Sequence, residues 1–509
     1  MIKRHATTDA HCSRNREIGP ALLILAVWAV SRWIFLLKGG SFLARPLDFA
    51  MQYLDPALLR GDLLRSLLYL HTQPPLFNFF LGAVLKLSSD PGLSYELLFR
   101  TMGALFPLLF YAVFRLLEIR RWIALAATSV FMFNPTLLLY ENLLYYTYVE
   151  GFLVMLSIFL FACWCTGYRP GVLLLFWLSM LCLGLTRSLF HPVFFFAVAA
   201  GLALHLRRSR PGPKRAGAFL LSSAAALLPL LALCLKNLLV FGFFGTSSWA
   251  GMSLWTKVNG FMPEQLEELH SRGIVSRVAL QAELRAFQPI DHYFDDSGLQ
   301  EVPCHHPADC AVRKSTGKPN FNHGGYVQVS RQLMKDAVAL IFHDPGLFIF
   351  YTAGSYSLTQ WYCSDSVHAL FAKNMEILEK TEKIYRFLFF GFLGAESKHA
   401  DPGMLIRTVA VTLFYLVLYA GTLAILIRND DCIPACLGSV CLFCLLVHAY
   451  TIGISSIIEF GENNRFRFPV DAACAVLAAG NIQAWTGIRR RRADGSAAPD
   501  GRSVSCRTG

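Results

Sequence analysis

Long apolar runs separated by short basic segments constrain the fold of this chain more than any other feature. Several runs approach the ~20 residues that an α-helix needs to cross the hydrocarbon core of a bilayer. Of the 509 residues, 55% are hydrophobic and only 16% are charged. One soluble core cannot hide that much apolar surface. The sequence therefore predicts an all-α, polytopic integral membrane protein.

The basic residues indicate how the chain is oriented in the bilayer. A formal net charge of +12 would suggest a nucleic-acid partner in a soluble protein. Here the cations lie in short clusters between apolar runs, which the positive-inside rule explains better. Clusters at 3–16, 207–215 and 489–492 predict that both ends of the chain are cytoplasmic. We expect a lipid bilayer as a partner and no nucleic acid.

Alternation of these clusters across the bilayer predicts roughly ten spans with both ends on one side. The predicted spans cover residues 20–37, 97–117, 122–140, 148–166, 171–186, 192–206, 216–240, 404–427, 433–456 and 470–487. The run 76–86 is too short to span and predicts an interfacial helix. The apolar stretches 337–358 and 384–394 are interrupted by His343-Asp344-Pro345 and by glycines. They predict interfacial helices or one further hairpin of spans, and we favour the first.

Changes in composition divide the chain into five segments. These are a cytoplasmic N-terminal segment (1–19), a transmembrane module (20–240) with a first external loop (38–96), a large external region with interfacial helices (241–403), C-terminal transmembrane helices (404–487) and a disordered cytoplasmic tail (488–509).

The first external loop carries acids directly beside a span. Asp48, Asp55 and Asp62 precede the turn His71-Thr72-Gln73-Pro74-Pro75. Acids beside a membrane are costly unless they function there, and a partly desolvated carboxylate can act as a general base. For each acid the structural alternative is a helix cap at the membrane surface.

Three motifs in this loop resemble the GT-C superfamily of polyprenyl-phosphate-sugar-dependent glycosyltransferases. They are Asp-x-x-x-x-Tyr beginning at Asp48, the pair Gly61-Asp62, and Pro74-Pro75-Leu76. They look most like the protein-mannosyltransferase and aminoarabinose-transferase type. The resemblance implies a GT-C-like helical bundle in which Asp48 is the catalytic acid of the first external loop. Phe49 stands where the family has Glu, which leaves Asp55 as a rival.

The resemblance continues along the predicted external face. Asn134-Pro135 followed by an acid resembles the family's second acidic motif, and the segment 461–469 resembles the approach to its last span. The implied substrate-binding residues are His71, Gln73, Tyr140, Glu141, Glu150, Arg187, Arg465 and Arg467. An arginine fork matches phosphate oxygens, although an interfacial Arg also snorkels to lipid headgroups for purely structural reasons.

The implied activity is transfer of a sugar from a polyprenyl-phosphate donor to a glycan, lipid or protein acceptor on the external or luminal face, by an inverting displacement. A divalent metal is compatible with this chemistry but not required, and no metal ligands are predicted. We favour the bacterial inner membrane over the endoplasmic reticulum. The alternative is a lipid-linked polysaccharide polymerase or ligase. A transporter is less favoured, because transporters keep ionisable residues within their spans.

The segment Cys304-His305-His306-Pro307-Ala308-Asp309-Cys310 contains residue types that bind metals. Zinc sites usually begin with two Cys separated by two to four residues and need a second pair elsewhere. The wider spacing and the predicted external location favour a small Cys304–Cys310 disulfide instead.

Overall fold

The computed structural model describes residues 2–208, 213–283, 285–294, 304–360, 368–388, 402–428 and 435–496. Within these ranges the regular structure consists of helices, with no β-strand. Two isolated β-bridges, Leu43 with Leu143 and Arg313 with Pro319, are the only extended pairings found there. The predicted all-α class is therefore confirmed.

Six helices are long and apolar enough to cross a membrane. They are α1 (Ile2–Leu37, through its part Glu17–Leu37), α6 (Pro91–Leu116), α9 (Tyr146–Gly167), α12 (Pro213–Phe241), α21 (Pro402–Arg428) and α22 (Ala435–Ile458). Large apolar side chains such as Leu22, Leu239 and Val417 are exposed on their outward faces. A lipid environment covers such faces, so the chain is an integral, multi-pass membrane protein.

The described residues do not confirm the predicted ten spans. The count there rises from six to eight if two bent helix pairs are each taken as one span. These pairs are α7 (Arg121–Met132) with α8 (Pro135–Glu141), bent by 60°, and α18 (Gly325–His343) with α19 (Pro345–Thr359), bent by 108°. Helices α5 (Leu76–Leu87), α10 (Pro170–Thr186) and α11 (Pro192–Arg208) are apolar but shorter.

A recurring two-residue pattern explains where several helices begin. An Asp or Asn side chain accepts a hydrogen bond from a backbone N–H of the first turn, and the next residue is Pro, which needs no partner for its nitrogen there. The pattern occurs at Asp55-Pro56, Asp90-Pro91, Asn134-Pro135 and Asp344-Pro345. Because the third of these starts a new helix, the predicted span 122–140 consists of two helices, α7 and α8, with a bend between them.

The remaining helices are short, or lie across or beside the long ones. They are α2 (Pro46–Phe49), α3 (Pro56–Gly61), α4 (Leu63–Leu68), α20 (His368–Leu388), α23 (Asn463–Arg467), the 3-10 helix η3 (Phe468–Val470) and α24 (Asp471–Ser496). The predicted disordered tail begins too early, because α24 continues past residue 488 to Ser496. Residues 497–509 lie outside the described ranges, as do residues 389–394 of the predicted interfacial stretch 384–394.

Between α12 and α19 the chain builds a second, smaller core, and we call residues 249–343 the lobe. Its helices are α13 (Ala250–Trp255), α14 (Pro263–Ser271), α15 (Arg277–Gln281), α16 (Asp291–Phe294), α17 (Pro307–Cys310) and α18. Trp255, Tyr293 and Tyr326 are fully buried in this core. Gly251 lets α13 approach α18 closely, because a Cβ at that position would lie 1.8 Å from the carbonyl oxygen of Ser330.

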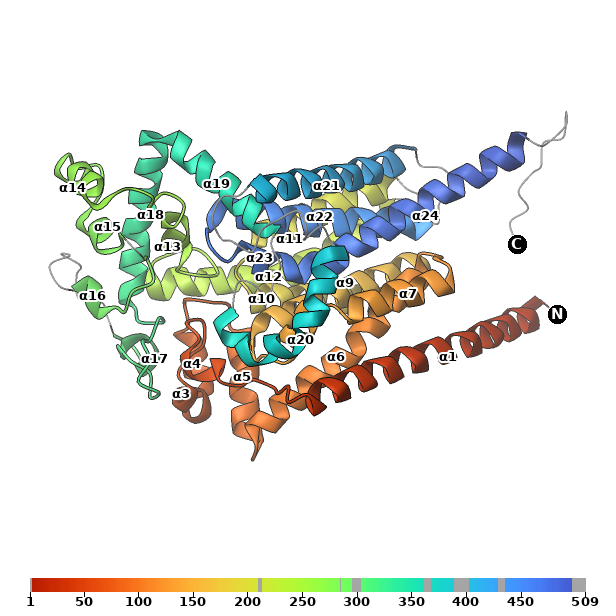
Figure 1. The fold of residues 1–509 in the computed structure, drawn as a ribbon, viewed down its shortest axis with the longest axis horizontal. Coiled ribbons are helices and arrows are strands. Elements are labelled where there is room, and N and C mark those ends of the chain that lie inside the picture. The colour runs from red at the N-terminus through yellow and green to blue at the C-terminus, as the bar shows by residue number, and fades with distance from the viewer. Residues whose placement is uncertain are drawn as a thin grey trace.

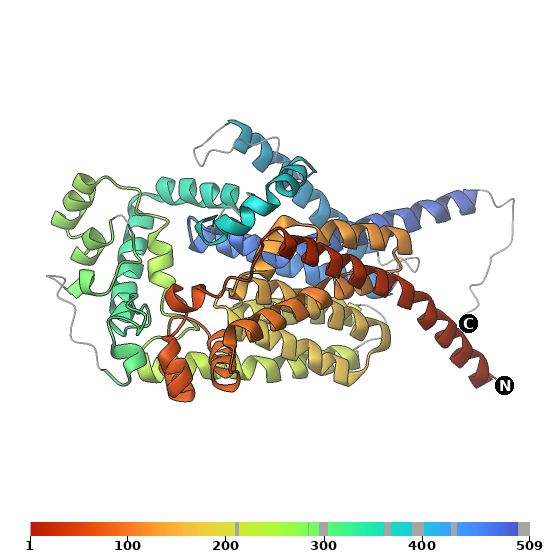
Figure 2. The same ribbon diagram turned by 60° about the horizontal axis from the view of Figure 1, so that its bottom comes forward.

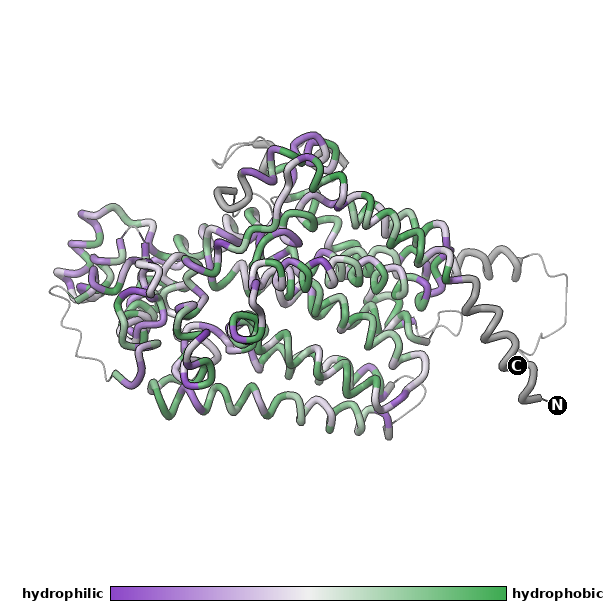
Figure 3. Tube along the Cα trace, turned by 90° about the horizontal axis from the view of Figure 1, so that it is seen from below, coloured by the Kyte–Doolittle hydropathy of each residue, from purple (hydrophilic) through white to green (hydrophobic). Residues whose placement is uncertain are grey.

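The lobe and the chain ends lie at opposite ends of the bundle of long helices. Figure 1 places α13 to α18 at one end, and the first turn of α1 and the last turn of α24 at the other. Figure 2 shows the same separation from a second direction. Figure 3 shows apolar residues concentrated along the long helices and polar residues gathered in the lobe. The first turn of α1 and the last turn of α24 therefore lie at the same end of the bundle.

Candidate functional site

The first loop (residues 38–75) lies against the lobe, which holds it by hydrogen bonds. Lys314 Nζ donates to the carbonyl oxygen of Ala50 at 2.8 Å, and Thr316 Oγ1 donates to that of Asp48 at 2.8 Å. The segment before these residues is closed by a Cys304–Cys310 disulfide, which confirms the predicted pairing. The lobe thus fixes the loop that carries the predicted catalytic acids.

Asp48 and Asp55 differ in what their carboxylates do. Asp55 is the N-cap of α3 and accepts from Ala57 N at 2.9 Å, from Ser315 N at 2.7 Å and from Ser315 Oγ at 2.5 Å. Both of its oxygens are therefore used to cap a helix and to join the loop to the lobe. The side chain of Asp48 is exposed, and its carboxylate forms no hydrogen bond or ion pair with any described residue. Of the two predicted bases, only Asp48 keeps a carboxylate available for an acceptor.

His71 is fully buried between the first loop and the lobe. Its Nε2 lies 3.0 Å from the carbonyl oxygen of Asn322 and its Nδ1 lies 2.8 Å from Ser248 Oγ. Because a carbonyl oxygen only accepts, Nε2 carries the proton and Nδ1 accepts from the serine hydroxyl. Burial lowers the pKa of His71 to about 3, so the ring is neutral. Through these contacts His71 links the first loop to the lobe. Gln73 beside it is half-buried.

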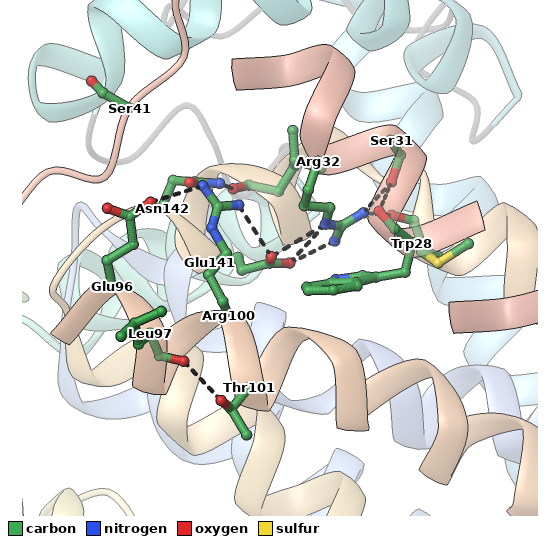
Figure 4. Close-up of polar contacts among 12 residues, drawn as sticks. Trp28, Ser31, Arg32, Ser41, Glu96, Leu97, Arg100, Thr101, Glu141 and Asn142 are labelled. Carbon is green, nitrogen blue, oxygen red and sulfur yellow. Dashed lines mark hydrogen bonds and ion pairs between the residues drawn. The ribbon is translucent and has the colours of Figure 1, made fainter. Parts of the chain in front are cut away.

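Glu141 lies in a closed ion-pair group that we call the inner cluster, with Arg32 of α1 and Arg100 of α6 (Figure 4). Arg32 Nε lies 3.2 Å and 3.1 Å from the two oxygens of Glu141, and its Nη2 lies 2.5 Å from Oε2. Arg100 Nη1 faces Oε1 at 3.5 Å. Gly103 packs directly on the carboxylate, because a Cβ there would lie 2.5 Å from its Cδ. The cluster joins α1, α6 and α8.

The pairing of Glu141 was missed at the sequence level. Arg32 lies inside the predicted span 20–37, 109 residues before Glu141, and Arg100 lies inside the next predicted span. A cation in an apolar run is costly unless it is paired, so it was a sign that an acid had to be nearby. Tyr140, next to Glu141, is also buried and its ring packs 4.8 Å from that of Phe468.

A second buried group lies where α9, α10 and α23 meet, and we call Glu150, Arg187, Glu462 and Arg465 the rim cluster. Arg187 Nη1 donates to Glu150 Oε2 at 2.9 Å. Its guanidinium carbon stands 4.1 Å from the ring centre of Phe466 and 5.2 Å from that of Tyr146. These cation–π contacts hold the guanidinium in an aromatic, water-poor setting.

Arg465 lies on the same aromatic rings. Its Nη2 pairs with Glu462 Oε2 at 2.6 Å and its Nη1 donates to the hydroxyl of Tyr145 at 2.5 Å. Its guanidinium carbon stands 5.8 Å from the ring centre of Tyr146 and 5.7 Å from that of Phe466. The two arginines are thus brought together by the aromatic rings that both contact.

The rim cluster retains hydrogen-bonding capacity. Arg465 Nε and Glu150 Oε1 are buried and have no hydrogen-bond partner among the described residues. Buried polar atoms without partners are uncommon in proteins and call for an explanation, such as a ligand. Arg467, by contrast, is directed elsewhere: it donates to the carbonyl oxygen of Thr359 at 2.9 Å and pairs with Asp471 at 3.2 Å.

An apolar groove of about 770 Å³ lies between α5, α6, α9 and α10, and its wall includes Phe79, Leu98 and Leu153. Val149 and Thr186 also line it, and each immediately precedes a member of the rim cluster in the chain. The groove is therefore an apolar surface near the rim cluster, although no member of that cluster lines it.

The first loop also reaches the rim cluster. The hydroxyl of Tyr145, which accepts from Arg465, donates to Gln52 Oε1 at 3.3 Å. Tyr53 donates to the carbonyl oxygen of Leu144 at 3.1 Å, and its ring centre lies 6.0 Å from that of Tyr145. The backbone that carries Asp48 therefore runs past the arginine pair within a few residues.

No group of three or more His, Cys, Asp or Glu side chains in the described part of the chain is arranged to hold a metal ion. The histidines of the disulfide loop have protein partners instead. His305 Nδ1 lies 3.0 Å from Asp309 Oδ2, and His306 Nε2 lies 3.3 Å from Asp62 Oδ2. This loop therefore serves to attach the lobe to the first loop.

Comparisons with known proteins add little. No family model and no curated protein matches the sequence. A similar solved structure is the archaeal oligosaccharyltransferase AglB from Archaeoglobus fulgidus, in complex with an inhibitory peptide and a dolichol-phosphate. The TM-score is 0.39 and the identity 13%, over 95% of this chain and 53% of the archaeal chain. This chain thus spans about half the length of that protein. At such low similarity, the assignment of function depends on the site itself.

Proposed function

We propose that this protein is a membrane glycosyltransferase of the GT-C type, which transfers a sugar from a polyprenyl-phosphate donor to an acceptor. The observation that supports this most is that Arg187 and Arg465 are held on the same aromatic rings, and that Thr186, the residue before Arg187, lines an apolar groove. A polyprenyl-phosphate sugar has a long apolar chain, an anionic phosphate and a polar sugar in that order. The groove, the arginine pair and the first loop offer matching environments in the same order.

The arginine pair suits a phosphate leaving group. A guanidinium donates parallel hydrogen bonds to phosphate oxygens, and such charge-assisted bonds are about twice as strong as neutral ones. The aromatic rings around both arginines exclude water, which strengthens the interaction with negative charge as it develops on the phosphate. Arg465 Nε, which has no hydrogen-bond partner among the described residues, is an available donor.

Asp48 is the proposed general base. Its free carboxylate can take the proton from an acceptor hydroxyl or amine as that group attacks the sugar carbon. The bond from sugar carbon to phosphate oxygen then breaks, and the phosphate keeps the electron pair. Attack from the face opposite the phosphate inverts the configuration of that carbon. We further propose that this occurs on the external face of a bacterial inner membrane.

A sugar-transfer assay on membranes, with a panel of polyprenyl-phosphate sugars, tests this function. Asp48→Asn is expected to abolish transfer while expression and thermal stability stay normal. Asp55→Asn is the matched control, because Asn caps a helix about as well as Asp and the base stays in place. It should retain transfer.

The other outcomes are equally informative. Loss of transfer in Asp55→Asn alone would move the base to Asp55 and keep the class of enzyme. Full activity in both variants would remove the first loop from the chemistry and favour a lipid-linked polysaccharide polymerase or ligase.

A further inference from the structure

One buried asparagine fixes the part of the first loop that reaches the arginine pair. Asn78 of α5 is 2% exposed, and its Nδ2 donates to the carbonyl oxygen of Gln52 at 3.1 Å. Its Oδ1 accepts from Leu54 N at 2.8 Å. Between these two residues Tyr53 is buried, and its ring centre lies 5.3 Å from that of Phe77. The backbone at Gln52 is therefore held in place by protein contacts.

The side chain of Gln52 is connected to Arg465 through one phenol. Arg465 Nη1 donates to the hydroxyl oxygen of Tyr145 at 2.5 Å. That hydroxyl donates its own proton to Gln52 Oε1, at the longer distance of 3.3 Å. A phenol has one proton to donate, and Oε1 is the acceptor atom of the Gln52 amide. The two contacts therefore orient the amide so that Oε1 faces Tyr145 and Nε2 faces a different direction.

The amide nitrogen of Gln52 remains available. Nε2 donates to no residue that the structure describes, and the side chain is half-buried. An amide nitrogen carries two N–H donors and accepts nothing. A ligand atom that meets it must therefore be an acceptor, such as a hydroxyl, carbonyl or phosphate oxygen.

Gln52 lies between the two halves of the proposed reaction. It follows Asp48, the proposed base, by four residues in the first loop, and its amide contacts the phenol that holds Arg465. In an inverting displacement the base acts on one face of the sugar and the leaving group departs from the other. The sugar must therefore occupy the interval between the first loop and the arginine pair. The side chain of Gln52 extends from the loop into this interval.

We propose that Gln52 is a sugar-recognition residue: its Nε2 donates a hydrogen bond to a hydroxyl oxygen of the transferred sugar. The inference rests on the proposed function, in that the ligand is a polyprenyl-phosphate sugar with its phosphate at Arg465. Gln52 moves no proton and forms no covalent bond. Because the amide is neutral, it binds a hydroxyl without adding charge beside the phosphate. Because protein contacts already hold it, little side-chain freedom is lost when the sugar binds.

Binding of matched phosphodiester probes to the purified full chain in detergent tests this role. Farnesyl methyl phosphate carries a prenyl chain and a single negative charge but no sugar. The sugar probes are the farnesyl phosphates of mannose, glucose, galactose and arabinose, which carry the same charge. The ratio of the affinities of a sugar probe and the methyl probe isolates the contribution of the sugar. We expect the wild type to bind at least one sugar probe more tightly than the methyl probe.

Gln52→Met keeps the length of the side chain and removes both polar atoms. We expect it to lower the affinity ratio of the preferred sugar probe about threefold to tenfold, the equivalent of one neutral hydrogen bond. Loss of the acceptor for Tyr145 weakens both probes by a common factor, which cancels in the ratio. If Gln52→Met does not fold, Gln52→Asn, which withdraws the amide by one methylene, should lower the ratio as well.

A matched control is Gln288→Met, the same change at a half-buried glutamine of the lobe. It should keep the wild-type affinity ratio. An unchanged ratio in Gln52→Met overturns the proposal, because Gln52 then acts only through Arg465 or through the fold. A fall in the ratio that Gln288→Met shares also overturns it, as does a wild type that prefers no sugar probe to the methyl probe.

Failure of the proposed function has a different signature. The wild type then binds farnesyl methyl phosphate no better than the uncharged farnesyl methyl ether. In that case the rim cluster is not a phosphate site, and the role of Gln52 falls with it. If the phosphate is required for binding but the affinity ratio does not depend on Gln52, the donor site stands and only the role of Gln52 falls.

Discussion

The inner cluster and the rim cluster both consist of arginines and glutamates, but the two clusters differ in their surroundings. In the inner cluster one carboxylate, Glu141, is shared by Arg32 and Arg100. In the rim cluster Arg187 and Arg465 each have their own acid. Buried atoms without a hydrogen-bond partner among the described residues occur in both clusters, Arg100 Nη1 in the first and Arg465 Nε and Glu150 Oε1 in the second, so unmet hydrogen bonds alone do not distinguish the two.

The two clusters differ in how tightly the neighbouring helices pack around them. Helix α6 packs on Glu141 so tightly that Gly103 has no room for a side chain. The arginines of the rim cluster instead lie on aromatic rings, and the chain neighbours Val149 and Thr186 line an apolar groove. Burial of an Arg–Glu pair is thus a poor guide to function by itself. The space next to the pair decides whether a ligand can bind there.

The largest expected effect follows from removing the acid of the inner cluster. Glu141→Ala leaves Arg32 buried without a counter-charge, while Arg100 keeps its ion pair with Glu96, and the change is expected to cost about 3–5 kcal/mol of stability. Thermal unfolding in detergent, together with the yield of monodisperse protein, measures it. Glu150→Ala is the matched change in the rim cluster. It should cost less, because Arg187 keeps its contacts with Phe466 and Tyr146. Equal losses in both variants would contradict the distinction.

A substitution that keeps the charge sharpens the comparison. Arg465→Lys removes the planar fork that matches a phosphate, and we expect binding of a prenyl phosphate to weaken about tenfold to a hundredfold, the equivalent of one or two charge-assisted hydrogen bonds. Arg32→Lys should leave this binding unchanged and lower only the thermal stability. Weaker binding in Arg32→Lys, at a temperature where it remains folded, would show that the inner cluster takes part in ligand recognition.

The smallest effects concern packing. Gly103→Ala forces a methyl group against Glu141, and overpacking of this kind typically costs about 1–3 kcal/mol. Gly151→Ala places its methyl group 3.3 Å from the ring of Phe468, which a small shift of that ring can accommodate. Its effect on thermal unfolding should be clearly smaller. A larger loss in Gly151→Ala would mean that the rim is packed as tightly as the inner cluster.

Much of the fold could be predicted from the sequence, because apolar runs and basic clusters report directly on helices and their direction. The break at Asn134-Pro135 was visible, yet a single span was predicted, since hydropathy alone does not register a 60° bend. The lobe could not be predicted. Several of its helices are only a few residues long, and its core depends on contacts such as those of Trp255 and Tyr326 with residues distant in the sequence.

The candidate site was predictable in part. The alternation of spans predicted that Arg187 and Arg465 lie on one face of the membrane. It did not predict that both arginines pack on the same two rings, Tyr146 and Phe466. The cap role of Asp55 was a stated alternative and agrees with its contacts.

Photo-crosslinking tests the central claim, that the rim cluster and its groove receive a lipid phosphate, most directly. The full-length protein is incubated with a prenyl phosphate that carries a diazirine in its chain. The sample is irradiated, and the labelled peptides are identified. We predict labels on the groove walls formed by α5, α6 and α9. Unlabelled prenyl phosphate should reduce this labelling and prenol should not, and the labels should be lost in Arg187→Met. Labels spread over the outward faces of α12 and α21, without competition by the phosphate, would contradict the account.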